Sequence, residues 1–276
     1  MNQAVTPAAG GGGISVQATQ AALRRLAWGV AGIAILALLW LLAGELLANN
    51  PTTKSFTTFG LIPTLEAFPE LWGAGKIQAA SQASLYRLGM GLGIAIAIGV
   101  PIGVLMGRIK WFHNYSNSPF QFLRMISPLS WMPLAVLVFA TWNGSIIFLI
   151  AIASVWPVMF ATAAGLAKVD PNWFKVARNL GAHPIQMLTK IIMPAIAFDI
   201  FSGIRLALGV AWIVLVPAEY LGVTSGLGYA IEDARETLSY NHLTALVLTI
   251  GCIGYVLDSV LVMLIKHFSW HRGGTN

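Results

Sequence analysis

Long uncharged apolar segments alternate with short polar ones along this chain. Residues 26–44 and 88–107 contain no charged residue, and neither does the much longer stretch 125–167. The sequence Trp142-Asn143-Gly144-Ser145 lies midway in that stretch and predicts a turn between two helices. Two further apolar segments, 195–221 and 243–265, carry few charges. Because a lipid core requires roughly 20 apolar residues per helical span, the pattern predicts six transmembrane helices.

Composition agrees with a membrane protein, since 57% of the residues are hydrophobic, 9% are charged and the mean hydropathy is +0.75. Soluble domains carry about 25% charged residues. We therefore predict an all-α, polytopic integral membrane protein whose membrane domain covers residues 23–270. Residues 1–22, rich in Gly, Ala and Gln, predict a disordered cytoplasmic tail, and residues 271–276 a short C-terminal tail. The first apolar run is longer than that of a signal peptide and no A-x-A site closes it, so we expect a retained helix.

Basic residues in the short loops predict the orientation of the chain. If the N-terminus is cytoplasmic, most of the sixteen Lys and Arg residues fall on the cytoplasmic side. These are Arg24, Arg25, Arg108, Lys110, Arg124, Lys168, Lys175, Arg178, Lys190, Lys266 and Arg272, whereas Lys54, Lys76, Arg87 and Arg235 lie outside. Cytoplasmic loops carry an excess of Lys and Arg, so both termini are predicted to be cytoplasmic. The net charge of +6 then reflects topology, not nucleic-acid binding.

A polar, basic segment within residues 170–194 separates two of the apolar segments. Asp170 and Pro171 predict a helix start, with an N-cap and a proline at the first helical position. Apolar residues follow on one predicted helix face: Trp173, Val176, Ala177 and Leu180. Gly181 allows a turn, and Pro184 predicts the start of a second short helix. Two amphipathic helices hinged at a glycine would form a compact knob that fits a groove on another protein. A basic loop lying on anionic lipid is the alternative.

This segment resembles the cytoplasmic EAA loop of ABC-importer permeases, whose pattern is E-A-A, three residues, G, nine residues, I, one residue, L-P. Four residues stand at the required spacings: Ala177, Gly181, Ile191 and Pro194. Three positions depart from the pattern, with Lys175 in place of Glu, Val176 in place of Ala and Met193 in place of Leu. The resemblance implies that Lys175, Ala177, Gly181, Ile191 and Pro194 couple the chain to a separate ATPase.

Further strings between residues 80 and 265 are similar to the nitrate/sulfonate/bicarbonate branch of these permeases, which includes taurine and cyanate systems. They are residues 84–87 (SLYR), 203–209 (GIRLALG), 217–221 (PAEYL) and 225–229 (SGLGY). The resemblance implies a type I importer permease in the bacterial inner membrane, paired with a second, identical subunit. It also implies two ATPase subunits that hold ATP and Mg, and an extracytoplasmic binding protein that delivers a small anionic solute. No cofactor is expected in this chain itself.

Candidate pathway residues lie in the fifth predicted helix, where Arg205, Trp212 and Glu219 are spaced by seven residues and share nearly one stripe. A charged side chain at the bilayer centre costs about 2.5–3.5 kcal/mol and normally faces protein or a water-filled cavity. We therefore predict that Arg205 lines the translocation pathway, where its charge would attract an anion, and that Glu219 serves gating or helix pairing. The alternative is that Arg205 pairs with Asp258 or Asp199 and locks two helices together.

The third predicted span contains two prolines, Pro128 and Pro133, that interrupt its backbone hydrogen bonds. Trp131 and Met132 lie between them, and we predict that they form a dry constriction of the pathway. A purely structural kink is the alternative. The second span repeats glycine every four residues, at Gly99, Gly103 and Gly107, which predicts close packing against another helix.

Enzymatic functions find little support in the sequence. No G-x-x-x-x-G-K-[ST] phosphate loop is present, so the chain is not expected to hydrolyse ATP. Cys252 is the only cysteine, and the five histidines do not pair at metal-ligand spacing on a core helix. Two other classes stay open: a secondary carrier or channel for small anions that works without an ATPase, and a membrane enzyme, for which no chemistry is visible.

Overall fold

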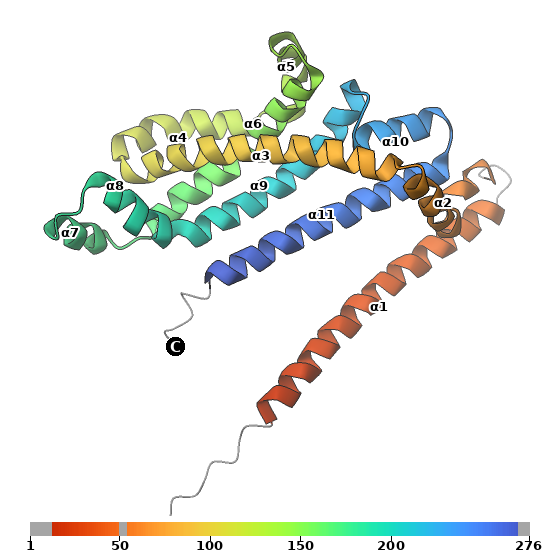
Figure 1. The fold of residues 1–276 in the computed structure, drawn as a ribbon, viewed down its shortest axis with the longest axis horizontal. Coiled ribbons are helices and arrows are strands. Elements are labelled where there is room, and N and C mark those ends of the chain that lie inside the picture. Colours follow the sequence, from red (N-terminus) through yellow and green to blue (C-terminus); the bar gives the residue numbers. More distant parts are fainter. Residues whose placement is uncertain (1–12, 50–53, 270–276) are drawn as a thin grey trace, which may run out of the picture. The chain divides into compact units, whose positions relative to one another are not determined.

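The computed structural model describes residues 13–49 and 54–269, and within these ranges every regular element is helical (Figure 1). The first half comprises α1 (Gly13–Asn49), η1 (Lys54–Phe59), α2 (Leu61–Gly73), α3 (Lys76–Arg108), α4 (Lys110–Met125), η2 (Pro128–Trp131) and α5 (Met132–Val138). The second half comprises α6 (Trp142–Ala167), α7 (Pro171–Asn179), α8 (Pro184–Gln186), η3 (Met187–Ile192), α9 (Met193–Gly222), α10 (Leu227–Glu236) and α11 (Tyr240–Ser269). The prediction of an all-α fold is confirmed.

The chain divides into two units, residues 1–67 and 68–276. In the first, α1 carries a candidate membrane span, Ala27–Leu46, and the Trp40 indole N–H donates a hydrogen bond to the Phe59 carbonyl oxygen at 2.9 Å. Because α1 begins at Gly13, the last part of the predicted disordered tail is helical; residues 1–12 lie outside the described part. The predicted C-terminal tail, 271–276, also lies outside it.

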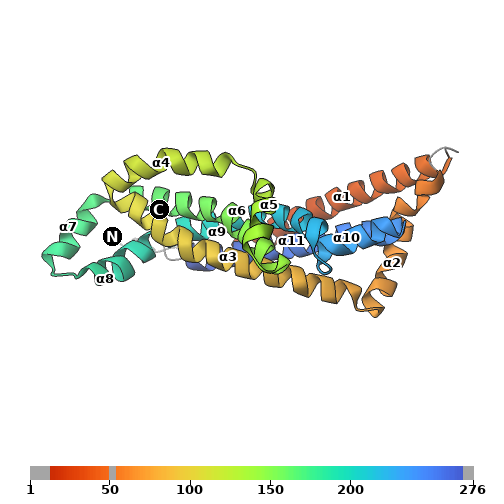
Figure 2. The same ribbon diagram turned by 90° about the horizontal axis from the view of Figure 1, so that it is seen from above.

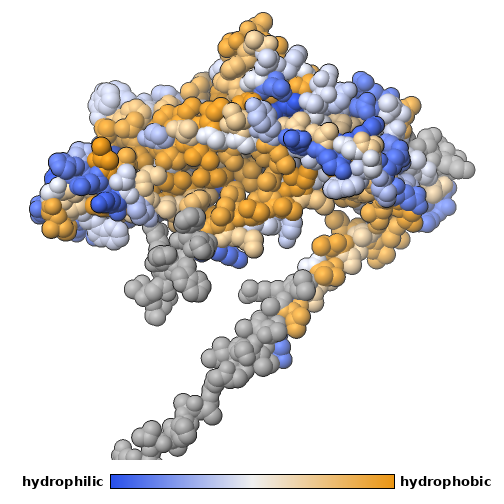
Figure 3. Space-filling model, in the orientation of Figure 1, coloured by the Kyte–Doolittle hydropathy of each residue, from blue (hydrophilic) through white to orange (hydrophobic). Residues whose placement is uncertain are grey.

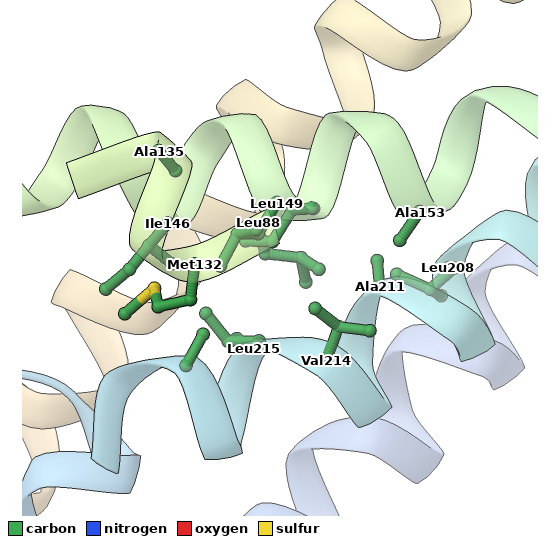
Figure 4. Close-up of a cluster of buried hydrophobic side chains, with 12 residues drawn as sticks. Leu88, Met132, Ala135, Ile146, Leu149, Ala153, Leu208, Ala211, Val214 and Leu215 are labelled. Carbon is green, nitrogen blue, oxygen red and sulfur yellow. The ribbon is translucent and has the colours of Figure 1, made fainter. Parts of the chain in front are cut away.

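In the second unit α6 is the central helix, and it packs along both α3 and α9. Its apolar side chains interdigitate with those of its neighbours in the cluster drawn in Figure 4, where Leu88 of α3, Leu149 of α6 and Leu215 of α9 converge. α11 packs against α9 and α10. Figures 1 and 2 place α7 and α8 together at one end of this unit and α10 at the other.

Helices α3 and α6 approach so closely that the glycine repeat of α3 leaves no room for side chains. A Cβ atom on Gly103 would lie 2.5 Å from the Met159 carbonyl oxygen, and one on Gly99 would lie 3.0 Å from that of Val155. On Gly107 a Cβ atom would lie 2.8 Å from the Leu166 Cβ. The predicted small-residue packing surface is therefore confirmed.

The described residues contain five helices that are long and apolar enough to cross a membrane, or six if the bent pair α4 and α5 forms one crossing. Figure 3 shows a broad hydrophobic surface over the long helices of the second unit, with hydrophilic surface towards α7 and α8 and around α10. A wide apolar band between two polar ends is the surface that a lipid bilayer requires. The predicted six-span architecture agrees with this count.

The third predicted span is wrong in its boundaries. We expected a helix that begins near Met125, but the helix beside α3 is the amphipathic α4, which ends there. After it the chain turns through η2 into α5, and the two parts, Lys110–Met125 and Pro128–Val138, meet at 89°. Ser127 precedes Pro128 and has ψ 128°, because a residue before proline is pushed out of the helical region. Arg124, expected in a cytoplasmic loop, lies in the helical first part of this bent pair, which counts as a candidate span if the two parts form one crossing.

Candidate functional site

The predicted knob is present as α7, a tight turn, and α8. The Asp170 carboxylate caps α7 by accepting a hydrogen bond from the Asn172 amide at 2.8 Å. Gly181 has φ +76°, and two 3.0 Å hydrogen bonds close the turn, from its amide to the Arg178 carbonyl and from the Ala182 amide to the Ala177 carbonyl. This is the Schellman arrangement, which requires the left-handed conformation that glycine adopts without strain.

The second predicted short helix does not end before the membrane. α8, η3 and α9 follow one another without a break, and together they form one candidate span, Pro184–Gly222. η3 is a π-helical segment within this run. A displacement of the knob would therefore be passed directly to α9, without a flexible linker between them.

The predicted coupling residues divide between the inside and the outside of the knob. Ala177 is buried in a small core with Met187 and Ile192, and Ile191 packs against that core. Lys175 and Pro194 are exposed.

The apolar residues that point outward from the knob are Trp173, Val176, Leu180, Ile185 and Leu188, of which Leu180 is 81% exposed. Only Ala177 of the predicted apolar face of α7 turns inward. The exposed face of the knob, defined by these five residues, is an apolar patch on an otherwise basic segment. An exposed apolar patch of this kind is typical of a surface that contacts another protein and not of a solvated loop.

A buried ion pair that the sequence did not reveal lies at the other end of the second unit. Arg87 of α3 and Glu219 of α9 are 2% and 0% exposed, and their nearest nitrogen and oxygen atoms lie 2.5 Å apart. The Arg87 guanidinium also donates to the Asn143 side-chain oxygen at 2.8 Å, and to the Ser225 carbonyl and hydroxyl oxygens at 2.8 and 2.6 Å. These partners come from α6, from α9 and from the segment between α9 and α10.

Glu219 accepts further hydrogen bonds that complete this buried network. Its second oxygen accepts from the Ser84 hydroxyl at 2.7 Å and from the Gly228 amide at 3.0 Å. The Ser84 hydroxyl accepts in turn from the Leu227 amide at 2.8 Å. The network therefore ties α3, α6 and α9 to the start of α10. Within it Glu219 pairs α9 with α3, and a gating role for Glu219 stays a prediction.

Arg205 lies in a different environment from Glu219. Its guanidinium donates two hydrogen bonds to the Asp258 carboxylate of α11, at 2.6 and 2.8 Å, and both side chains are about half exposed, at 47% and 45%. They line a cavity of about 650 Å³ between α9 and α11. Asp199, the other partner considered, pairs with Lys168 at 2.8 Å. The Arg205–Asp258 pair is the helix-locking contact that the sequence offered as the alternative to a pathway role. A place for Arg205 on the pathway stays a prediction.

The remaining predicted pathway residues meet at one core cluster, in which Met132 is buried and against which Trp131 and Trp212 pack. Trp212 packs against α11, where a Cβ atom on Gly254 would lie 2.8 Å from the Trp212 indole nitrogen. Met132 is buried in the core cluster, whereas Trp131 lines a second cavity, of about 600 Å³, among α4, η2, α6 and α9. Trp131 and Met132 therefore do not face the same cavity.

Comparison with known proteins now decides the family. The model described as "Binding-protein-dependent transport system inner membrane component" matches residues 99–270, more than half of the chain. The chain belongs to this family. The resemblance inferred from residues 175–194 is thus confirmed, and we refer to the chain below as the permease.

Curated relatives refine this assignment. The permease is 35% identical over 184 residues to the bicarbonate transport system permease protein CmpB of Synechococcus elongatus, a match that covers 66% of each chain. It is 36% identical over 197 residues, 71% of each chain, to a putative aliphatic sulfonates transport permease protein of Bacillus subtilis. A putative ABC transporter permease protein of Methanocaldococcus jannaschii is 31% identical and is matched over 83% of the permease and 87% of its own length.

Solved structures of similar fold belong to the same class of transporter. The MetNI methionine ABC transporter, in inward-facing conformations, superposes with a TM-score of 0.58 at 16% identity, covering 73% of the permease and 98% of its own chain. A bacterial alginate ABC transporter, solved with an alginate-bound periplasmic protein, gives 0.60 at 16% identity, covering 91% and 97%. At this identity the likeness shows the fold, which confirms an ABC permease architecture.

Proposed function

We propose that the permease is the transmembrane subunit of an ATP-driven importer for a small anionic solute. The relatives named for bicarbonate, sulfonate and nitrate support the anionic class. The observation that carries the proposal is the exposed apolar face of the knob at the start of an unbroken helix into the membrane. A docked ATPase would cover this face, and its movements would reach α9 directly.

The mechanism we propose is alternating access by two copies of the permease. Closure of two cytoplasmic ATPase subunits on ATP would draw the two knobs together, and each attached α9 would then open the pathway outward. ATP and Mg would be held by the ATPase subunits, not by this chain. A binding protein outside the inner membrane would deliver the solute, as the periplasmic protein bound to the alginate transporter suggests. With both termini cytoplasmic, the knob would lie on the ATPase side.

A charged residue on the exposed face of the knob should detach the ATPase. Leu180→Asp would place a carboxylate in an apolar contact, so we expect the co-purified ATPase to fall at least about tenfold, which corresponds to about 1.4 kcal/mol. The measurement is purification of the tagged permease from its native membrane in mild detergent, with co-eluting proteins identified by mass spectrometry.

The matched control for this experiment is Leu238→Asp, since Leu238 is exposed to 67% but lies beyond α10, away from the knob. Its φ of 56° is tolerated by aspartate at least as well as by leucine. The control should retain the ATPase. If the unaltered permease elutes alone in repeated mild preparations, a secondary carrier or channel becomes the better interpretation.

The turn at Gly181 should be required for coupling and not for membrane insertion. A β-branched residue at φ +76° is strained by roughly 1–2 kcal/mol, so Gly181→Val should distort the Schellman turn and strongly reduce ATP-dependent uptake. Space is not the obstacle, because no atom lies within 4 Å of a Cβ placed there. Gly181→Asn, which adopts the left-handed conformation more readily, should retain most uptake. Full uptake by Gly181→Val would argue against the hinge role.

A further inference from the structure

Arg124 occupies an unusual place for a positive charge. It lies in the last turn of α4, about 21 Å along that helix from its first residue, Lys110, which one residue separates from the end of α3. Its guanidinium lies over the ring of Phe160 of α6, 5.5 Å from the ring centre. Phe160 is about 10 Å from the Ala167 end of α6, so Arg124 lies well inside the candidate spans.

Arg124 has no acidic partner, unlike Arg87 and Arg205, which lie in the middle of their candidate spans; Arg108 at the end of its span also lacks one and lies over the Phe174 ring. Arg87 is neutralised by Glu219 and Arg205 by Asp258. Among the residues that the structure describes, no carboxylate pairs with Arg124, and its only polar or aromatic contact is with the Phe160 ring. An unpaired charge at membrane depth is costly unless it faces water or a ligand, and such residues mark solute pathways.

The cavity beside Arg124 has room for a small solute. Its volume is about 600 Å³, and its walls come from α4, η2, α6 and α9. The lining is largely apolar and aromatic, with Trp131, Trp156 and Val210 among its residues, and Arg124 is the one charged residue in it. Apolar walls with a few well-placed polar groups are typical of small-molecule sites.

The arginine side chain is suited to binding a planar oxyanion such as nitrate or bicarbonate, or the three oxygens of a sulfonate group. A guanidinium presents five N–H donors in a fixed fork that binds such oxygens in pairs. The guanidinium lies over the Phe160 ring in a cation–π contact, which occupies none of its N–H donors with a hydrogen bond. Within the described residues these donors make no hydrogen bond to the protein, so the fork is available to a solute.

We propose that this cavity holds the transported anion within the membrane and that Arg124 binds it through the guanidinium. The inference rests on the proposed function for the transport of an anion, and it assigns to Arg124 the role that the sequence suggested for Arg205. A fixed positive charge beside apolar walls would admit bicarbonate, nitrate or a sulfonate and exclude cations. Neutralisation of Arg205 by Asp258 leaves that side chain less suited to the task.

The charge of Arg124 can be measured without knowing the solute. Because Cys252 is the only cysteine, Cys252→Ser gives a background in which Ile126→Cys reports on the cavity, since Ile126 lines this cavity and not the one between α9 and α11. We would compare the rates at which this cysteine reacts with two thiosulfonate reagents, one carrying an anionic sulfonate group and the other a cationic trimethylammonium group. The full chain in its native membrane would be used. Arg124→Gln should lower the anionic-to-cationic rate ratio by about tenfold, and Arg124→Lys should preserve it.

Two matched controls localise this effect. Lys110→Gln removes the same charge from the other end of α4 and should leave the ratio unchanged. Ile213→Cys lies in the cavity between α9 and α11 and not in the one beside Arg124, so its ratio should change little with Arg124→Gln. An unchanged ratio at Ile126→Cys would overturn the inference.

Uptake of labelled nitrate, bicarbonate and taurine by the complete transporter separates the inference from the proposed function. Arg124→Gln should reduce uptake of the accepted anion at least about tenfold while the ATPase still co-purifies, with partial activity in Arg124→Lys. Equal uptake by Arg124→Gln and the unaltered permease would overturn the inference alone. If the unaltered permease imports none of the three while the rate ratio still shifts, the anion-import function fails and the anion-attracting site at Arg124 stands.

Discussion

Replacing Glu219 by alanine is expected to cause the largest loss of stability of any single charge removal in the permease. The Arg87 guanidinium would stay buried opposite an empty space, and removing one partner of a buried ion pair costs about 3–5 kcal/mol. The Ser84 hydroxyl and the Gly228 amide would lose their acceptor as well. We expect a much lower thermal unfolding midpoint in detergent. The midpoint is measured by size-exclusion chromatography of heated samples with fluorescence detection.

The double variant Arg87→Met, Glu219→Leu tests the cause of this loss. Removing both charges leaves no unpaired ion, so the double variant should be more stable than either single replacement. Asp258→Ala provides a comparison, because it breaks an ion pair whose side chains are about half exposed, and it should lower the midpoint far less. A single Glu219→Ala variant as stable as the unaltered permease would contradict a structural role for the network.

Replacing Gly103 by alanine is expected to separate the two most closely packed helices of the second unit. The new methyl group would lie 2.5 Å from the Met159 carbonyl oxygen and 2.6 Å from the Thr162 Cβ, and backbone at this distance cannot move aside without displacing α6. Overpacking of this kind costs about 1–3 kcal/mol. The same thermal assay should show a clear loss for Gly103→Ala.

Gly93→Ala is the matched control, because it lies in the same helix and no atom is within 4 Å of a Cβ placed there. Alanine is a better helix former than glycine by about 1 kcal/mol, so this variant should be neutral or slightly stabilising. Opposite signs for the two substitutions would identify contact with α6 as the cause. Equal losses would instead attribute the effect to the backbone of α3 itself.

Much of the fold could be predicted from runs of apolar residues, because a lipid-crossing helix leaves a long uncharged segment in the sequence. This reasoning placed the helices that became α3, α6, α9 and α11. It failed at α4, whose polar residues meet the hydropathy criterion for a span only together with the apolar residues that follow the bend. Averaged hydropathy cannot distinguish a helix that lies beside other helices from a loop in water.

The site was predictable where the backbone required a particular residue, and not where distant side chains meet. Gly181 marked the knob because few residues adopt φ +76°. The Arg87–Glu219 pair was not visible, since the two residues are 132 positions apart and loop-charge counting treats every arginine alike. Arg124 was placed in a loop for the same reason, although its position beside an uncharged run could have raised the question of its depth.

The separation of Arg87 from Glu219 also bears on how the permease is made. A ribosome adds about 5–20 residues per second, so roughly 7–26 s pass between the synthesis of Arg87 and the synthesis of Glu219, which neutralises it. During that time the newly made segment must keep its guanidinium in water or against lipid headgroups. Assembly at the α10 end of the second unit is therefore completed only after α9 has entered the membrane, and a chain truncated before Glu219 would carry an unmatched arginine.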